Sequence, residues 1–278
     1  MNYPGLSDAR KLRREGLFES LRDETAAVKI QAARGCRILR AESMMKVMKI
    51  AIISTENDNL LTAEAHAFLP KLLKGLTDNG NQVNLFTKDA PAGDALDEAT
   101  AQSNPLLHRS LWQLRGAVEE NLHDSARWLN EFETDIYLIW NGDAAAWAVL
   151  PLLKPATATI AVGHADSEVF YAPARHYRSF LTRVIGMTPE TCVGFVINCV
   201  IDKERVEWIS YGELEGSSAD APEAELQTVV ETYETCFEKA IADALAAPRE
   251  ISANFPPLLL NRWAAPSWFD RLKAKIMN

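Results

Sequence analysis

Two apolar runs, Ile136-Tyr-Leu-Ile-Trp140 and Thr159-Ile-Ala-Val162, decide the fold of this chain. Each run ends abruptly in small or polar residues: Asn141-Gly-Asp143 after the first and Gly163-His-Ala-Asp166 after the second. Continuous apolar runs of this length, separated by a helix-length segment, are typical of parallel strands that are covered on both faces. Ligands of an open parallel sheet bind just beyond the carboxyl ends of its strands, so we look for chemistry first at these polar residues.

The same alternation extends on both sides of the two runs. Apolar runs predict strands at 49–55, 82–87, 135–140, 159–162, 183–187 and 206–210. Apolar residues at helical spacing predict helices between them, at 62–77, 106–132 (as two helices), 144–153, 177–184 and 189–198. Alternating strands and helices select a doubly wound, mostly parallel α/β sheet over residues 48–212.

The two flanks of this region differ from it. Residues 1–47 hold ten Lys/Arg against six Asp/Glu, a net charge of +4, and predict a basic helical extension. Residues 213–224 are acidic and rich in Gly, Ser and Ala, as in a linker. Residues 224–246 carry an apolar stripe and predict one long helix, which a Pro- and Trp-containing arm follows up to residue 278.

Composition limits the classes of partner and compartment. The net charge of -9 and the pI near 5.2 argue against nucleic acid as a partner, because phosphate binding needs a basic face. The four cysteines are far apart and form no Cys-x-x-Cys pair, which favours reduced thiols and a cytoplasmic protein. The longest apolar run, 144–153, is far short of the ~20 residues of a membrane span, so we expect no transmembrane segment.

Three motifs, taken in order, resemble a known family. They are Val162-Gly-His-Ala-Asp166, Arg183-Val-Ile-Gly-Met-Thr-Pro-Glu190, and the stretch from Asp202 to Gly212 that contains Arg-Val-Glu-Trp-Ile-Ser-Tyr-Gly. Together with the opening strand at 48–55, they resemble family 4 glycosyltransferases of the GT-B architecture. The resemblance implies that residues 48–212 are the N-terminal, acceptor-side Rossmann-like half of such an enzyme. The chain then passes within a dozen residues into the helix at 224–246, so we expect the donor-binding domain to be missing.

The resemblance also points to His164 as the catalytic residue of the site. It matches the histidine that the family places in the cleft, beside the transferred sugar and the acceptor. An imidazole at a strand end can hydrogen-bond a hydroxyl and titrates near neutrality, which suits this role. A lone histidine is more often a structural residue, and that alternative stays open.

Further polar residues close to the same strand ends are candidates for substrate binding. Each has an ordinary structural alternative, namely a helix cap, a turn or a solvated surface. Many family members have a glycine-rich turn after the first strand. The turn here is acidic and has no glycine, so it would repel a phosphate. The candidates are Asn141, Asp143, Asp166, Glu168, Arg175, Glu56 and Asn57.

The resemblance therefore implies a glycosyltransferase-like protein that transfers a hexose from a nucleotide sugar to an acceptor, and we expect it to be incomplete on its own. No metal-ligand spacing and no phosphate-binding loop are found, and we expect no cofactor. The alternative is a non-catalytic binding or scaffold protein, with a protein partner over the cleft face. An exposed apolar patch on that face would favour the scaffold, and a polar cleft would favour the enzyme.

Overall fold

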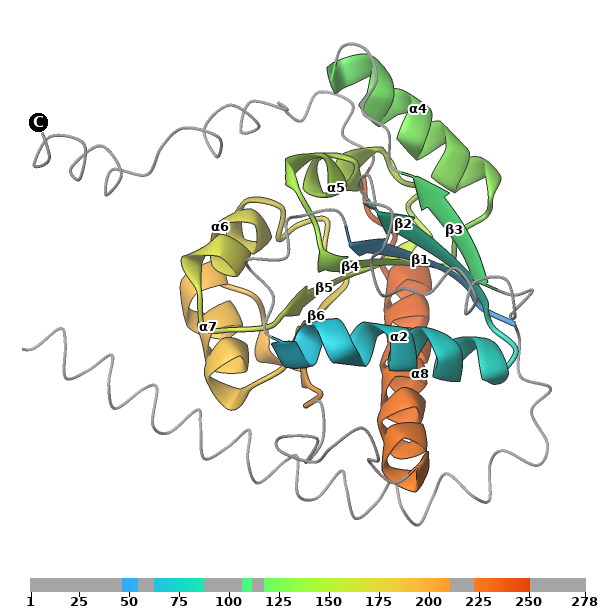
Figure 1. Cartoon of the computed structure of the whole chain (residues 1–278). Helices are drawn as coiled ribbons and strands as arrows, with labels where there is room; N and C mark the ends of the chain where they lie inside the picture. The colour runs from blue at the N-terminus through green and yellow to red at the C-terminus, as the bar shows by residue number, and fades with distance from the viewer. Residues whose placement is uncertain (1–46, 55–62, 88–106, 112–117, 211–222, 251–278) are drawn as a thin grey trace, which may run out of the picture.

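The structure is a computed structural model, and it describes residues 47–54, 63–87, 107–111, 118–210 and 223–250. Within these ranges, seven strands form one sheet in the order β3-β2-β1-β4-β5-β6-β7, and every neighbouring pair is parallel (Figure 1). The sheet confirms the α/β, Rossmann-like fold that the sequence predicts. Its strands are β1 (Lys49–Ser54), β2 (Gln82–Thr87), β3 (Leu107–Leu111), β4 (Ile136–Asn141), β5 (Ala158–Gly163), β6 (Arg183–Gly186) and β7 (Val206–Trp208).

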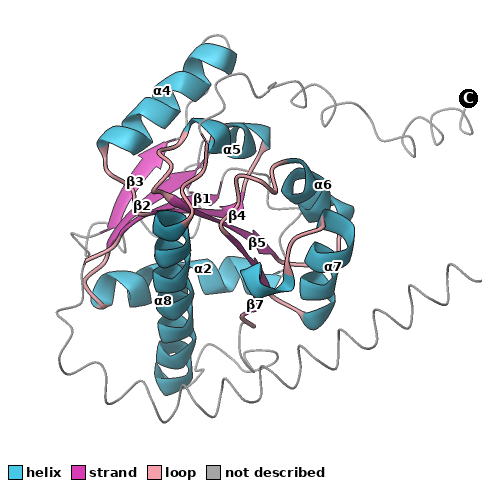
Figure 2. Ribbon diagram, turned by 180° about the vertical axis from the view of Figure 1, so that it is seen from behind, coloured by secondary structure: helices cyan, strands magenta, loops and turns pink. Residues whose placement is uncertain are grey.

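Helices cover both faces of the sheet. One face packs against α2 (Ala63–Asp78) and α8 (Glu223–Ala246), which cross each other in both views (Figures 1 and 2). The other face packs against α4 (Val118–Glu131), α5 (Ala144–Ala148), α6 (Glu168–His176) and α7 (Pro189–Cys199). Two short 3-10 helices, Leu150–Leu152 and Lys203–Arg205, complete the connections.

Alternate residues of each central strand enter the two layers of core. In β1, Ile50 and Ile52 pack on the side of α2 and α8, whereas Ala51 and Ile53 pack on the opposite side. All four are fully buried. Because both faces are covered, the strand reads as a continuous apolar run instead of an alternating one.

The expectation of two helices between residues 106 and 132 is wrong in its first half. Residues Leu107–Leu111 form the edge strand β3, which pairs in parallel with β2. The second half is helical, and α4 buries Leu122, Ala126 and Leu129 against the sheet. The four-residue spacing of Leu107 and Leu111 fits a helical turn as well as a strand, so local spacing alone misassigns this segment.

The helix expected at 177–184 is also wrong, because the helix lies one segment earlier. α6 starts after Ser167, whose hydroxyl accepts a hydrogen bond from the Val169 amide, and ends at His176. The apolar residues Tyr177 and Phe180 are buried in the turns that lead to β6. Burial of side chains in a turn produces the same apolar spacing as a short helix.

The other elements lie within a few residues of their predicted bounds, although the helix expected at 144–153 is divided into α5 and a 3-10 turn. α8 is one helix, as expected. The basic extension, the turn with Glu56 and Asn57, most of the linker and the Pro/Trp arm lie outside the described residues. Among the described helices, none is both long and apolar enough to span a membrane.

Candidate functional site

The strand order reverses between β1 and β4. From β1 the chain winds outward through β2 to β3, and then returns to continue from β4 to β7 on the other side. In doubly wound sheets, the crevice at the carboxyl ends of the two strands at this switch point is where ligands bind. Here those ends are Ser54 and Asn141, which are paired across the two strands.

The turn after β4 is held by its own side chains. Asp143 caps α5, and its carboxylate accepts hydrogen bonds from the amides of Ala145 and Ala146, both at 3.1 Å. The indole Nε1 of Trp147 donates to the carbonyl of Gly142 at 3.2 Å. Asn141 is 2% exposed, whereas Asp143 is half-buried. The turn is therefore preorganised, and Asp143 is the side chain in it that a ligand reaches most easily.

His164 follows β5 and is 3% exposed. Its Nε2 lies 2.6 Å from the main-chain oxygen of Trp140, the penultimate residue of β4. Because a carbonyl oxygen only accepts, Nε2 carries a proton, and in the neutral ring Nδ1 is the acceptor nitrogen. The ring packs edge-on against Trp140, with centroids 4.6 Å apart, and against Phe170 at 5.7 Å.

The turn after β5 contains a second polar pair, which sequence reasoning did not predict. The hydroxyl of Tyr171, in α6, donates to the carboxylate of Asp166 at 2.9 Å. Burial of the tyrosine, followed by the hydrogen bond and charge of Asp166, raises the pKa of Tyr171 well above its usual value. Tyr171 is therefore a permanent donor, and it fixes one oxygen of the exposed Asp166 carboxylate.

Glu168 and Arg175 belong to the surface that α6 shares with α7. The guanidinium of Arg175 binds the Glu168 carboxylate at 2.9 Å, and its Nε donates to the carbonyl of Asn198 at 2.6 Å. Arg175 thus connects the ends of two helices. The structure brings His164 to Trp140 and Asp166 to Tyr171, and it brings Arg175 to α7 instead of to His164.

Two hydroxyl groups lie at the same edge of the sheet on the other side of the switch point. Ser54 ends β1 and pairs with Thr87, the last residue of β2. The Thr87 hydroxyl is buried and has no hydrogen-bond partner within the described part of the chain. A signal for these residues exists in the sequence, since each is the first polar residue after an apolar run. Across the described ranges, no three His, Cys, Asp or Glu side chains gather as metal ligands would.

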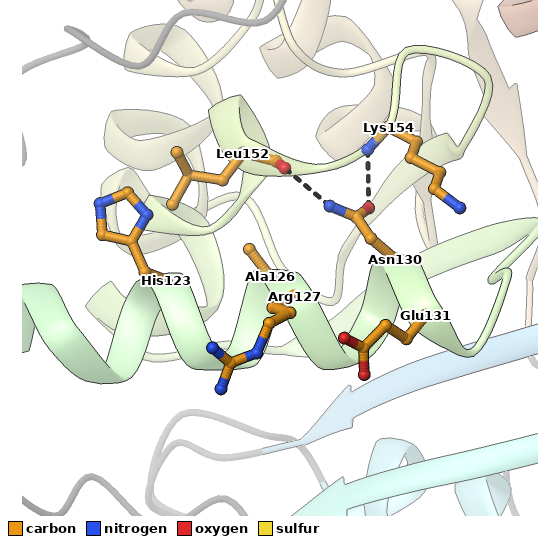
Figure 3. Close-up of a pocket in the computed structure, with 7 residues that line it drawn as sticks. All are labelled: His123, Ala126, Arg127, Asn130, Glu131, Leu152 and Lys154. Carbon is orange, nitrogen blue, oxygen red and sulfur yellow. Dashed lines mark hydrogen bonds between the residues drawn. The ribbon is translucent and has the colours of Figure 1, made fainter.

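A groove lies elsewhere on the molecule, between α4 and the turn that follows the 3-10 helix Leu150–Leu152 (Figure 3). Its volume is about 520 Å³. Asn130 joins its two walls, because its amide nitrogen donates to the Leu152 carbonyl at 3.1 Å and its amide oxygen accepts from the Lys154 amide at 2.8 Å. Its lining residues are His123, Ala126, Arg127, Asn130, Glu131, Leu152 and Lys154.

No family model matches the chain, and no curated protein matches it either. Among solved structures, a glycosyltransferase from Rickettsia africae ESF-5 is similar at 14% identity and a TM-score of 0.45, over 68% of this chain and 50% of that one. The lipopolysaccharide outer core galactosyltransferase WaaB is similar at 10% identity and a TM-score of 0.42, over 59% of this chain and 45% of the other. An α-glucosyltransferase in complex with UDP and a mismatched 13-mer DNA is similar at 14% identity and a TM-score of 0.36, over 59% and 40% of the two chains.

All three are glycosyltransferases. The matched part is half or less of the length of each of these proteins. At these identities and TM-scores, the likeness by itself identifies neither an activity nor a ligand for this chain.

Proposed function

We propose that residues 48–212 are the acceptor-side half of a glycosyltransferase-like protein of the family 4 type. The proposed ligand site lies at the carboxyl ends of β4 and β5, around Asn141, Asp143, His164 and Asp166. In the complete reaction, a hexose moves from a nucleotide sugar to a hydroxyl group of the acceptor. What supports the family assignment is the order of the three motifs and the opening strand in the sequence.

One observation carries the choice of site: the hydrogen bond from His164 to the carbonyl of Trp140. It joins the carboxyl ends of two neighbouring strands, next to the switch point of the sheet. The two polar turns that follow, Asn141–Asp143 and His164–Asp166, are thereby held side by side. Sugars are recognised by several hydrogen-bonding groups in fixed positions, and a rigid pair of polar turns can supply them.

The proposed roles follow from exposure and hydrogen bonding. Asp166 and Asp143 are accessible carboxylates that can accept hydrogen bonds from sugar hydroxyls. His164 is mostly buried, so we assign it the role of orienting the reacting groups, with its imidazole edge at the site. We propose that the remaining candidates contact the ligand at the periphery of the site. They are Asn141, the pair Glu168 and Arg175, and Glu56 and Asn57, which follow β1 in the sequence.

Transfer needs more than this half of a cleft. A single face neither excludes water nor holds two substrates in line, and both conditions contribute to the rate of group transfer. We therefore propose that the donor-binding face comes from a donor-side domain outside residues 48–212, either farther along a longer chain or in a partner chain. In this arrangement the present chain supplies the acceptor-side contacts.

The scaffold alternative gains no support from the described surface. The large apolar side chains that are exposed there are Val47, Trp128, Val169, Val200 and Leu245. Only Val169, in the first turn of α6, is close to the carboxyl edge of the sheet. Single exposed apolar residues are normal on any protein surface, whereas a docking face needs a contiguous patch.

Nuclear magnetic resonance tests the location of the site. We expect UDP-glucose, GDP-mannose or an acceptor hexose to shift the amide signals of the turns after β4 and β5, and Asp166→Asn to reduce these shifts. Asp202→Asn is the matched control, because Asp202 is also exposed but lies before β7, at the opposite edge, and makes no capping hydrogen bond. Shifts confined to other surfaces, or equal effects of both substitutions, would refute this site.

A further inference from the structure

Arg249 fixes the position of the chain just after α8. Its guanidinium donates four hydrogen bonds, all to uncharged oxygens: Thr159 Oγ1 at 3.0 Å and the carbonyls of Phe180, Lys154 and Thr157, each at 2.9 Å. These acceptors lie at or before the start of β5 and in the turns before β6. Burial lowers the pKa of Arg249 to about 10. A half-buried guanidinium with four acceptors is a strong anchor for the segment that carries it.

The anchor lies beside the groove that α4 forms with the turn Leu152–Lys154, here called the α4 groove. The Lys154 carbonyl accepts from Arg249, and the Lys154 amide donates to Asn130, which joins the two walls of the groove. One residue thus contacts both the anchor and the groove. Through Lys154, which lines the α4 groove, Arg249 holds the end of the described chain close to this groove.

The floor of the α4 groove is apolar. Ala126, which is 4% exposed, and the half-buried Leu152 form it. Polar groups of both charges stand around it, as the close-up shows: those of His123, Arg127, Asn130, Glu131 and Lys154 (Figure 3). Such a groove suits an uncharged apolar segment of chain on its floor, with the charged groups of the rim remaining in water.

The chain continues for 28 residues beyond the described part, from 251 to 278. The first eleven of these, Ile251–Asn261, carry no charge and include Phe255-Pro-Pro-Leu-Leu-Leu260. An extended chain spans ~3.3 Å per residue, so eleven residues reach about 36 Å. The 14 residues of α4 span about 21 Å, so the segment is long enough to follow the whole groove.

We propose that residues 251–261 dock in the α4 groove, with Arg249 as the anchor that starts the docked segment. Two consecutive prolines leave a free chain few backbone conformations, which lowers the entropy lost on docking. Phe255 and the leucines after Pro257 cover the apolar floor. The docked segment makes α4 a covered helix and attaches the carboxyl-terminal arm to the domain, independently of any ligand at the carboxyl edge of the sheet.

Double electron–electron resonance, which measures the distance between two spin labels, tests this proposal on the full chain. Spin labels are placed at Asp124→Cys, which is exposed on α4 outside the groove lining, and at Asn261→Cys, at the end of the segment. The background is Cys36→Ser, because the other three cysteines are buried. We expect one narrow distance distribution. We expect Leu258→Asp to remove the narrow component, although residue 258 lies outside the described fold. We expect the same of Leu152→Asp, on the groove floor. Leu245→Asp is the matched control: Leu245 is 61% exposed on α8, and its replacement leaves the distribution unchanged.

Two results would overturn the proposal. A broad distribution in the unsubstituted pair means that the segment does not dock in the groove. A narrow component that disappears when labelled chain is diluted with unlabelled chain means that the segment of a second copy fills the groove. Circular dichroism of each variant shows whether the domain is folded, and the Leu258→Asp result stands even where Leu152→Asp unfolds it.

Discussion

The imidazole Nε2 of His164 lies 2.6 Å from the main-chain oxygen of Trp140 and connects the end of β5 to the end of β4. The bond is buried, and the His164 ring packs against both Trp140 and Phe170. The histidine that the resemblance identifies therefore also has a structural role. Its removal affects the geometry of both polar turns, and any functional test of His164 has to separate this effect from chemistry.

Replacement of His164 by Asn should destabilise the domain. The shorter side chain leaves the Trp140 carbonyl without its buried partner, which costs about 1–3 kcal/mol of unfolding free energy. His123→Asn is the control, since His123 is exposed on α4 and its replacement should change stability by less than about 0.5 kcal/mol. Urea denaturation of the two variants measures the difference. Equal stabilities would mean that the His164 bond contributes nothing.

Replacement of Val200 by Gly should stabilise the domain. Val200 ends α7 in the left-handed conformation, with φ of 56°, and is 70% exposed. For a residue with a β carbon this conformation costs about 1–2 kcal/mol, and glycine does not pay that cost. Val169→Gly is the matched control, because Val169 is an exposed valine in the first turn of α6, where glycine should destabilise. In thermal unfolding, the midpoint temperature should rise for Val200→Gly and fall for Val169→Gly.

The three described cysteines should be unreactive in the folded protein. Burial raises the pKa of Cys192, Cys199 and Cys236 to about 12. In a Cys36→Ser chain at pH 8, iodoacetamide should modify none of them until denaturant is added. Rapid modification of the native chain, read by mass spectrometry, would contradict the burial of these thiols.

The raised pKa of these three thiols predicts how the free energy of unfolding depends on pH. Their folded pKa lies above the unfolded value of 9.0, so the folded state holds its protons longer. Their contribution to stability is complete below pH 9 and is lost as the pH rises toward about 12. Replacement of one thiol, as in Cys236→Ala, should weaken this alkaline decline in denaturation experiments. An alkaline decline of the same slope in the variant would count against the linkage.

Much of the fold could be predicted from the sequence, because the buried strands are apolar on both faces. Six of the seven strands follow from runs such as Ile136–Trp140 and Thr159–Val162. β3 was missed because an edge strand is partnered on one side only and here reads Leu-His-Arg-Ser-Leu, with apolar residues four apart. α6 was placed too late because Tyr177 and Phe180 are buried from turns instead of from a helix.

For the candidate site, the sequence predicted which residues follow the strands but not which groups they bind. Because strand ends are visible in the sequence, Asn141, Asp143, His164 and Asp166 could be located at one edge of the sheet. Their partners could not be predicted, because they depend on how the strands and helices pack. The carbonyl that His164 binds belongs to a residue 24 positions away, and the Arg249 guanidinium binds residues up to 95 positions away.

The central claim is that the carboxyl ends of β4 and β5 form a sugar-binding face, and one calorimetric titration tests it most directly. The full chain is titrated with UDP-glucose, GDP-mannose and acceptor hexoses, together with His164→Asn, Asp166→Asn and the controls His123→Asn and Asp202→Asn. We predict that at least one ligand binds, that both site variants weaken it by about tenfold or more, equal to about 1.4 kcal/mol, and that neither control does. Absence of any heat of binding at millimolar ligand, or equal weakening by the control variants, would contradict the account.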